Sequence, residues 1–527
     1  MNTNASNNQK PSTDTNMKSS VNTTTTTTET MSTHTSTKLQ ELFASRGPIK
    51  TIGVIGMGYV GIPAAMLFAD APEFDSVYGF QRDSKTSGYK IAMLNNGESP
   101  LKGEEPGLEE LIAKVTGTDG GENSGRPKFT CTPDFSKIAG CDAVTLAIQT
   151  PFANPKDLIP NFTPLIEGIR NVGRYLTPGT LVVLESTITP GTTAGMAREI
   201  LEEESGLVAG KDFGLAHAPE RVMVGRLLKN IQEHDRIVGG INDPSTERAC
   251  ELYGPVLTKG QLIPMNATAA EVTKTAENTF RDLQIAAANQ LALYCEAMGI
   301  NFYDVRTGVD SLKGEGITRA ILWPGAGVGG HCLTKDTYHL ERGVEQLGPD
   351  SLDWPDDIAS LYVSSRMIND FMPSHMLHLT ESALQQVGKT MAGAKIALLG
   401  WAFLNDSDDA RNTPAEPFYQ AAIAAGAEVR IHDPWVDPET AADVPDDVEI
   451  THDLDAVLSG ADAVVIFAGH KEYRSLNPTE VKALCGERGH PVIVDGRNVA
   501  DPDEWIGSGY VYRGIGRGDK NGHPLVE

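Results

Sequence analysis

Two series of short apolar runs, one on each side of a long helical pattern, constrain the fold of this chain more than any other feature. Helix-length segments separate the runs within each series, which is the pattern of βαβ units and a parallel sheet. The sequence therefore predicts an α/β protein with two Rossmann-like, doubly wound domains. The runs are residues 51–55, 76–80, 143–148 and 181–184 in the first series, and 395–399, 428–432, 463–467 and 491–494 in the second.

The helical pattern between the two series covers residues 266–298. Thr268 and Glu271 form a capping box at its start, and Gly299 follows its end, so we expect one long central helix in a helical middle domain. The first residues are almost wholly Ser, Thr and Asn and cannot bury enough apolar surface to order themselves. The predicted domains are a disordered tail at 1–47, an N-terminal Rossmann domain at 48–245, a helical domain at 246–385 and a second Rossmann-like domain at 386–527.

The charge balance is strongly acidic, with 70 Asp and Glu against 44 Lys and Arg and a formal net charge of −26. Such a surface repels nucleic acid and anionic membranes, so neither is expected as a partner. The excess fits an ordinary solvated acidic exterior and equally fits a protein from a high-salt, halophilic cytoplasm. No run of 18 apolar residues and no secretory leader is recognisable, and the six cysteines lack paired spacing, so we expect a cytoplasmic chain without a metal site.

A glycine loop follows the first apolar run directly and precedes a helical segment at residues 62–69. In the dinucleotide fingerprint the first glycine permits a tight turn, the second lets the backbone approach a pyrophosphate, and the third lets helix and strand pack closely. This placement predicts a bound NAD or NADP rather than a plain glycine-rich turn. The predicted cofactor residues of the loop are Gly56, Gly58, Tyr59, Val60 and Gly61.

The end of the second run carries no acid for the ribose 2′-hydroxyl of NAD, because Gln81 and Arg82 stand there. This pair could accept the 2′-phosphate of NADP, or Asp83 could bind the ribose after a small change of register. NAD is the expected cofactor, and NADP stays possible. Thr150 and Thr187 follow later strands at the edge where such sheets bind ligands, although both loops could be simple strand-to-helix turns.

The glycine-rich stretch at residues 324–333 places Cys332 at the end of a flexible loop. Such a loop packs poorly but allows close backbone approach to a ligand, so Cys332 is the predicted nucleophile. A zinc site formed by His331, Cys332 and Asp336 would lack a second pair of ligands, and a redox-sensing or merely buried cysteine is the stronger alternative.

Lys274 and Asn278 stand four residues apart and therefore share one face of the long helix. A cation beside an amide could stabilise an oxyanion, although this spacing alone fits a solvated helix face better. Glu220 follows the apolar residues 213–216 and could orient or activate water.

These motifs together resemble the UDP-glucose/GDP-mannose dehydrogenase family over residues 49 to about 517. The stretches that carry the resemblance are the glycine loop, Glu185-Ser186-Thr187, Pro219-Glu220-Arg221, residues 270–274 with Asn278, Gly329-Gly330-His331-Cys332, and residues 494–498. The resemblance implies a nucleotide-sugar 6-dehydrogenase that oxidises a primary alcohol to a carboxylate with two hydride transfers to NAD(P). Residues 219–225 and 236–240 look more like the UDP-N-acetyl-D-mannosamine branch than the UDP-glucose branch.

The resemblance also implies a role for each matched residue. Cys332 would form a thioester, Lys274 and Asn278 would hold its oxyanion, and Asp336 and Glu220 would help to activate cysteine or water. Lys274 is expected to favour the Cys332 thiolate. Thr150 would lie near the reacting carbon, and the C-terminal domain would hold UDP. The further expected substrate contacts are Arg221, Val222, Gly329, Arg411 and Arg497.

Two departures from the family pattern concern the cofactor and the sugar. Gln81 replaces the usual strand-end acid, and Leu404 stands where many relatives carry a lysine. UDP-glucose and UDP-N-acetylglucosamine are alternative substrates. A single-hydride β-hydroxyacid dehydrogenase and a non-catalytic nucleotide-sugar or NAD sensor are the rival functions. The apolar residues of the middle domain suggest a homodimer.

Overall fold

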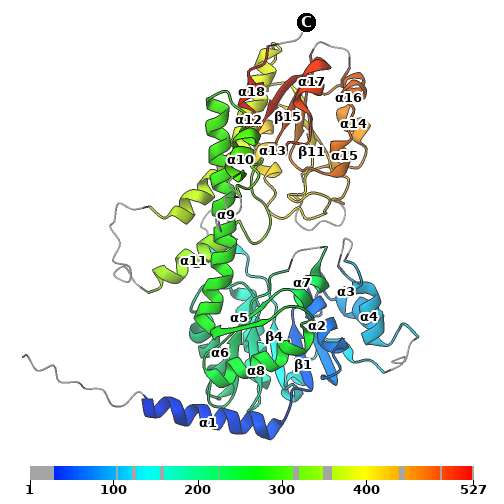
Figure 1. The fold of residues 1–527 in the computed structure, drawn as a ribbon. Helices are drawn as coiled ribbons and strands as arrows, with labels where there is room; N and C mark the ends of the chain where they lie inside the picture. Colours follow the sequence, from blue (N-terminus) through cyan, green and yellow to red (C-terminus); the bar gives the residue numbers. More distant parts are fainter. Residues whose placement is uncertain are drawn as a thin grey trace, which may run out of the picture.

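The computed structural model describes residues 29–101, 105–120, 126–154, 159–222, 225–311, 320–347, 359–437, 444–445, 447–486 and 490–524. Two lobes are joined by the long helix α9, Ala267–Ala297, which runs from one into the other (Figure 1). Each lobe contains a doubly wound sheet, so the predicted fold class, two Rossmann-like domains with a helical segment between them, is confirmed.

The N-terminal sheet has eight strands in the order β10-β9-β8-β7-β4-β1-β2-β3, and all neighbours pair in parallel except β8 with β9. The chain reverses direction along the sheet between β1 and β4, which is where open α/β sheets bind ligands. The strands are β1 Thr51–Ile55, β2 Ser76–Phe80, β3 Phe129–Thr132, β4 Ala143–Leu146, β7 Leu181–Leu184, β8 Gly214–His217, β9 Arg236–Gly240 and β10 Leu262–Asn266.

Helices cover this sheet, and a small hairpin of β5 Phe152–Asn154 and β6 Ile159–Pro160 extends from it. The helical elements are α2 Gly61–Asp70, α3 Tyr89–Asn95, α4 Leu108–Thr116, η1 Phe135–Gly140, α5 Thr163–Tyr175, η2 Thr193–Ala197, α6 Arg198–Ser205, α7 Leu227–Glu233, α8 Asp243–Tyr253 and η3 Gly254–Val256. The predicted boundary at residues 245/246 is wrong, because it cuts through α8 and separates β10 from the sheet that it completes.

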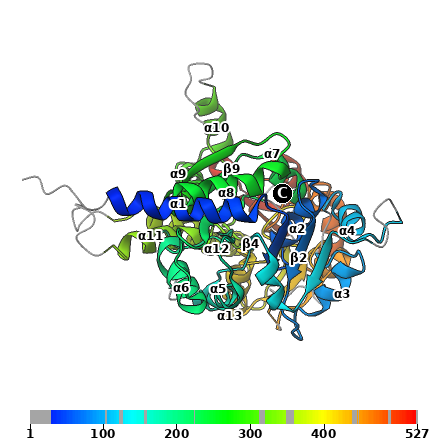
Figure 2. The same ribbon diagram turned by 90° about the horizontal axis from the view of Figure 1, so that it is seen from below.

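Helix α1, Glu29–Arg46, overturns part of the predicted disordered tail. Its side chains Leu39 and Phe43 are buried, and the Arg248 guanidinium of α8 lies 5.1 Å from the Phe43 ring. Lys38 pairs with Asp212 on the same lobe. Figure 2 shows α1 lying across the end of the N-terminal lobe that is remote from the C-terminal lobe. The prediction followed the polar composition of the segment and overlooked the two apolar side chains, Leu39 and Phe43, that attach α1 to the lobe. Residues 1–28 of the expected tail lie outside the described residues.

The middle segment consists of α9 with α10 Phe302–Asp310, α11 Asp336–Glu345 and α12 Leu361–Gln386. The predicted long helix is confirmed, and Gly299 follows it with a left-handed φ of 69°. The predicted capping box is wrong. Asn266 caps the helix by accepting the Ala269 N–H at 2.8 Å, while the Glu271 carboxylate binds another part of the lobe.

The C-terminal sheet is parallel throughout, in the order β13-β12-β11-β14-β15-β16. Its strands are β11 Lys395–Leu399, β12 Glu428–His432, β13 Ile450–Thr451, β14 Ala463–Ile466, β15 Val492–Asp495 and β16 Val511–Gly514. Its helices are α13 Ala415–Ala424, α14 Leu454–Leu458, α15 Lys471–Arg474, α16 Pro478–Cys485, α17 Pro502–Gly507 and α18 Gly518–Asn521. The second half of α9 and α12 share one apolar core with this sheet, so the middle segment is built into the C-terminal lobe.

Candidate active site

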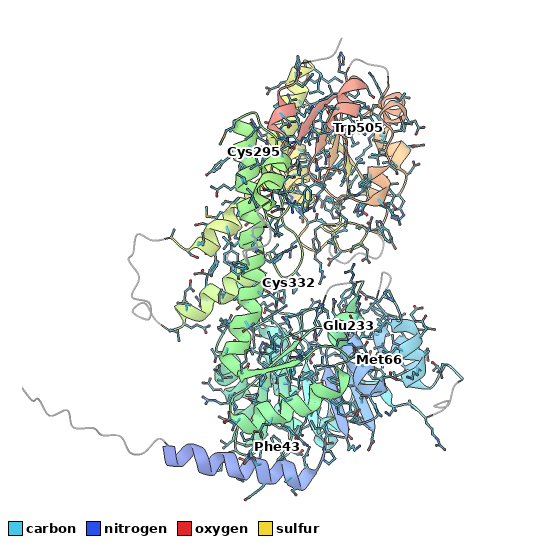
Figure 3. The ribbon with its side chains drawn as sticks, in the orientation of Figure 1. Phe43, Met66, Glu233, Cys295, Cys332 and Trp505 are labelled. Carbon is cyan, nitrogen blue, oxygen red and sulfur yellow. The ribbon has the colours of Figure 1, made fainter. Side chains whose placement is uncertain are left out.

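Cys332 lies between the two lobes beside α9 (Figure 3). Its side chain is solvent-exposed. Its backbone carbonyl accepts the N–H groups of Lys335 at 3.1 Å and Asp336 at 2.9 Å, which places the cysteine one turn before α11. The sequence therefore presents a thiol to the interlobe space on a loop whose far end is fixed by a helix.

The glycines before Cys332 pack against the C-terminal lobe. A Cβ on Gly329 would collide with the Cβ of Phe403, and one on Gly330 would lie 2.8 Å from the Phe403 ring. The Gly330 N–H also donates to the Arg411 carbonyl at 2.8 Å. The predicted need for close backbone approach is thus met by a protein neighbour, and the proposed substrate contact of Gly329 stays a prediction.

Three predicted catalytic residues meet at the start of α11. The Asn278 side-chain amide on α9 donates to the Asp336 carboxylate, and the Lys335 ammonium contacts its other oxygen at 2.9 Å. Burial of Asp336 opposes its ionisation, but the Lys335 and Lys274 ammonium groups prevail and lower its pKa. The site therefore contains an ionised carboxylate held between an amide and two cations.

The expectation that this site favours the Cys332 thiolate is wrong for the structure. Desolvation by the surrounding walls raises the pKa of the thiol, and the neighbouring Asp336 carboxylate raises it further. Lys274, Lys335 and Arg411 lower it without overcoming these effects. Lys274 acts in the predicted direction, but the sequence did not indicate how strongly desolvation by the surrounding walls and the Asp336 charge would oppose it.

The glycine loop has the geometry that a dinucleotide needs. Gly56 has a φ of 97°, which L side chains avoid, and a Cβ on Gly61 would collide with the Gly56 carbonyl oxygen. A Cβ on Gly58 would meet nothing within 4 Å, so the backbone is open to a ligand there. Tyr59 and Val60 complete the loop before α2. The residues present fit a pyrophosphate at the start of this helix.

Gln81 and Arg82 at the end of β2 bind other parts of the protein. The Gln81 amide accepts the Met57 N–H at 3.4 Å and donates to Ser87 Oγ at 2.9 Å, so it supports the glycine loop. The Arg82 guanidinium pairs with Glu167 at 2.9 Å on the surface. The structure leaves the proposed nucleotide contacts of both residues as predictions.

Thr150 and Thr187, which follow β4 and β7, lie together. The Thr150 hydroxyl donates to the Thr187 carbonyl at 2.7 Å, and the Ile148 N–H donates to Ser186 Oγ at 3.0 Å. The loops after β4 and β7 are therefore fixed to each other next to the glycine loop. Strand order determines this neighbourhood.

Glu220 lies in a buried ionic cluster that the sequence analysis missed. Its carboxylate pairs with the Arg236 guanidinium, which also lies 3.2 Å from Glu185 and 4.3 Å from the Tyr253 ring centroid. The Tyr253 hydroxyl donates to Glu185 at 2.6 Å. A charged residue at the start of the apolar strand Arg236–Gly240 was the available signal. Glu220 is thus held in an ion pair with Arg236. To act on water as proposed, its carboxylate must break this ion pair or bind water while still paired.

The side chains of Arg221 and Val222 have different neighbours, a carboxylate on α9 and the apolar core. The Arg221 guanidinium lies 3.6 Å from the Glu277 carboxylate on α9, and Val222 packs against the apolar core of the N-terminal lobe. Their proposed substrate contacts stay predictions.

Arg411 and Arg497 both belong to the C-terminal lobe, and Arg411 also reaches the N-terminal lobe. The Arg411 guanidinium binds the Asp409 carboxylate through Nε at 2.8 Å and Nη2 at 2.5 Å, and lies 5.6 Å from the Tyr59 ring centroid of the glycine loop. Arg497 donates to the carbonyl groups of Phe467 at 2.7 Å and Phe403 at 2.8 Å. Arg411 thus links the two lobes, while Arg497 braces the loops that support the cysteine. Leu404, next to Phe403, is exposed.

Three family descriptions match the chain in succession. They are those of the UDP-glucose/GDP-mannose dehydrogenase family: the NAD binding domain at residues 50–257, the central domain at 268–354 and the UDP binding domain at 397–502. The chain belongs to the UDP-glucose/GDP-mannose dehydrogenase family. It is accordingly an oxidoreductase, NAD is its cofactor, and a UDP-binding domain is present. A β-hydroxyacid dehydrogenase would have no use for that domain.

Relatives and solved structures agree with this assignment. UDP-N-acetyl-D-mannosamine dehydrogenase of Pyrococcus horikoshii is 35% identical over 89% of this chain and 99% of its own length. Its solved structure has a TM-score of 0.76 at 34% identity and covers 89% of this chain and all of that one. The NDP-N-acetyl-D-galactosaminuronic acid dehydrogenase of Methanosarcina mazei Go1 is 68% identical, with a TM-score of 0.83 over 92% of this chain and 99% of that one.

The described residues contain neither a candidate metal site nor a helix that could span a membrane. Among them, no group of three His, Cys, Asp or Glu side chains could hold a metal ion. In the same part of the chain, no helix is both long and apolar enough to cross a membrane.

Proposed function

We propose that the chain is an NAD-dependent nucleotide-sugar 6-dehydrogenase that oxidises UDP-N-acetyl-D-mannosamine to UDP-N-acetyl-D-mannosaminuronate through a Cys332 thioester. The observation that carries the proposal is the meeting of Cys332, Asp336, Asn278 and Lys274 between an NAD-binding lobe and a UDP-binding lobe. A single-step alcohol dehydrogenase needs no thiol there. A sensor needs none of the four.

The residues divide the chemistry among themselves. NAD, when bound at the glycine loop, would accept the first hydride from carbon 6 while a base or bound water takes the hydroxyl proton, and a second NAD that replaces the reduced cofactor would accept the second hydride. The Cys332 thiol gives its proton to a base or to water and its sulfur bonds to the intermediate aldehyde, and the resulting oxyanion is stabilised by the Lys274 ammonium and the Asn278 amide. Loss of the second hydride leaves a thioester. One water molecule then cleaves it, releasing the carboxylate and restoring the thiol.

Water activation falls to Asp336 or Glu220. Asp336 is ionised and adjacent to Cys332, but its lowered pKa makes it a weak base, so orienting water is the role that suits it. Glu220 is held by Arg236 and can accept a proton only if that ion pair is shared or broken. Asp336 is therefore suited to orienting water, whereas Glu220 would act as the base only after release from Arg236.

A second sugar is favoured by one specific observation. The Methanosarcina mazei protein, at 68% identity, is named for an N-acetyl-D-galactosaminuronic acid nucleotide, whereas the Pyrococcus protein named for N-acetyl-D-mannosamine is 35% identical. UDP-N-acetylgalactosamine is therefore the second candidate. Both candidates are N-acetylhexosamines that carry the primary alcohol at carbon 6.

A homodimer and a reducing, cytoplasmic location complete the proposal. Large apolar side chains that are at least half exposed include Phe280 and Tyr294 on α9, Met298 directly after it, and Met367 and Phe371 on α12. The two on α9 share one face of that helix, which suits burial against a second copy. All six cysteines are free thiols. Sedimentation of the wild type and of Met367→Glu tests the dimer, which we expect the substitution to weaken.

The experiment that tests the function counts reduced cofactor per sugar consumed. UDP-N-acetylmannosamine, UDP-N-acetylgalactosamine, UDP-N-acetylglucosamine and UDP-glucose are each incubated with NAD or NADP, in low and high salt. We expect two NADH per sugar with an N-acetylhexosamine and no uronate from Cys332→Ser. One NADH per sugar, or a fully active Cys332→Ser enzyme, would exclude the thioester route, and no turnover with any pair would favour the sensor.

A further inference from the structure

The face of α9 that points into the protein is polar over most of its length. Its members follow one another at separations of three, four, four and seven residues, which places them on one side of an α-helix. Four of them are buried, and the fifth, Asn278, is partly exposed. The set is Glu271, Lys274, Asn278, Asp282 and Asn289.

Each of these side chains serves a different element. Glu271 accepts the N–H groups of Gly191 at 2.6 Å and Thr193 at 2.7 Å in the loop after β7. Lys274 and Asn278 act on the start of α11, as described above. The last two members, Asp282 and Asn289, contact no residue of the candidate chemistry, and their partners lie on α12 and on the loop that leads to Cys332.

Asn289 binds the beginning of the cysteine loop. Its side-chain oxygen accepts the Gly325 N–H at 2.9 Å, and its amide donates to Asn369 Oδ1 on α12 at 2.8 Å. Asn289 and Asn369 are both fully buried. Because a side-chain amide in such a place must use its donor and its acceptor, these two bonds fix the Asn289 orientation and with it the position of Gly325.

Asp282 and Arg366 bind the end of the same loop. Asn369 donates to the Asp282 carboxylate at 2.8 Å, and the Arg366 guanidinium on α12 donates to the same oxygen at 2.6 Å. Arg366 Nη1 also lies 3.5 Å from the carbonyl oxygen of Leu333, the residue after Cys332. Arg366 is 1% exposed, so burial of its charge depends on the carboxylates that it meets.

The four side chains therefore form one continuous chain of hydrogen bonds from Gly325 to Leu333. It spans the loop from its first glycine to the residue beyond the thiol. Glycines give this loop little stiffness of its own. A network in which each member orients the next supplies the missing rigidity, because displacing one bond leaves buried polar groups without partners.

We propose that Asn289, Asn369, Asp282 and Arg366 are positioning residues that hold the loop at residues 325–333 so that the Cys332 thiol faces Lys274, Asn278 and Asp336. The proposal rests on the proposed role of Cys332 as nucleophile. It assigns to the middle segment a direct part in the reaction, through the loop, without contact with the sugar or the cofactor.

The test uses the full chain with Asn289→Leu, which keeps the volume and removes both hydrogen bonds. The rate of Cys332 alkylation by iodoacetamide is measured against pH, with Cys332→Ser as the blank. We expect the midpoint of this curve to move down towards that of a free thiol, and the plateau rate to rise at least threefold. In the same variant kcat should fall at least tenfold with little change in KM for NAD.

A matched control removes a different contact between α9 and α12, one that does not involve the cysteine loop. His375 on α12 lies 2.9 Å from the Glu296 carboxylate on α9, so His375→Gln disturbs the same helix pair. This control should retain the wild-type alkylation curve and kcat at a comparable loss of melting temperature. Asn369→Leu, which leaves the Gly325 bond in place, should give a smaller change than Asn289→Leu.

Two outcomes would overturn the positioning role. An unchanged alkylation curve in folded Asn289→Leu and Asn369→Leu would show that the loop does not need the network. Equal changes in His375→Gln would show a general effect of helix packing. Alkylation requires no turnover, so a wild-type enzyme that is inactive with every sugar would refute the proposed function and leave this measurement valid.

Discussion

Replacing Arg236 by methionine should produce the largest single loss of stability in the N-terminal lobe. Arg236 pairs with Glu185 and Glu220, and all three side chains are at most 6% exposed. Removing one partner of a buried ion pair costs about 3–5 kcal/mol, because a charge is left in the interior without compensation. For a lobe of this size each kcal/mol corresponds to about 2–4 °C, so we expect the melting temperature to fall by about 6–20 °C.

The pH dependence of this loss has a definite sign. Burial raises the pKa of Glu185, while Arg236 and Tyr253 lower it. Without the guanidinium the folded-state pKa rises further, so the folded protein binds a proton at a pH where the unfolded chain does not. The unfolding free energy of Arg236→Met should therefore increase as pH falls through that pKa, and the gap to wild type should narrow from pH 8 to pH 5.

Calorimetry of the wild type, Arg236→Met and the double variant Arg236→Met/Glu185→Gln checks the reasoning. The glutamine can still accept the Tyr253 hydroxyl and carries no charge, so the double variant should recover part of the lost stability, while Glu220 still lacks its partner. A melting temperature for Arg236→Met within 2 °C of wild type, assessed against the roughly 6–20 °C expected above, or a double variant no better than the single one, would refute the ion-pair account.

Three other measurements follow from features of the site and of the N-terminal helix. Asp336→Asn removes a charge that raises the pKa of Cys332, so the midpoint of thiol alkylation should move to lower pH; a move to higher pH would contradict the assignment. Removal of residues 1–47 exposes the sites of two buried apolar side chains of α1 and should cost about 3–6 kcal/mol in thermal unfolding, with kcat unchanged. Gly329→Ala should reduce kcat at least tenfold because its Cβ would collide with the Phe403 Cβ; full activity of Gly329→Ala would show that the loop can move freely.

Local pattern was sufficient where a residue's role depends on its neighbours in the chain. The turn at Gly56 and the close packing of Gly61 both follow from the strand before them and the helix after them. Lys274 and Asn278 share a helix face because of their spacing, and the structure directs both towards Asp336. Thr150 and Thr187 follow strands that the alternation of elements indicated, and the structure shows that these two residues are hydrogen-bonded to each other.

Tertiary contacts decided the features that the sequence analysis missed. Glu271 has the spacing of a capping box, but the N–H groups of the loop after β7 compete for its carboxylate, and Asn266 caps the helix instead. The pKa of Cys332 depends on how deeply the loop is enclosed, which composition does not reveal. Leu39 and Phe43 are buried because α1 packs on the N-terminal lobe, where Phe43 meets Arg248 of α8. Arg248 is about 200 residues away in the sequence, so the local pattern does not reveal this contact.

The length and register of α9 place a constraint on how this enzyme can vary. At 1.5 Å per residue its 31 residues span about 46 Å, from the NAD-binding lobe to the core of the UDP-binding lobe. Inserting one residue between Asn278 and Asn289 would turn every later side chain by about 100° and shift it by about 1.5 Å. Asn289 would then face away from Gly325 while Lys274 kept its place. Changes in length are therefore compatible with catalysis in the loops at either end of this helix, but not within it.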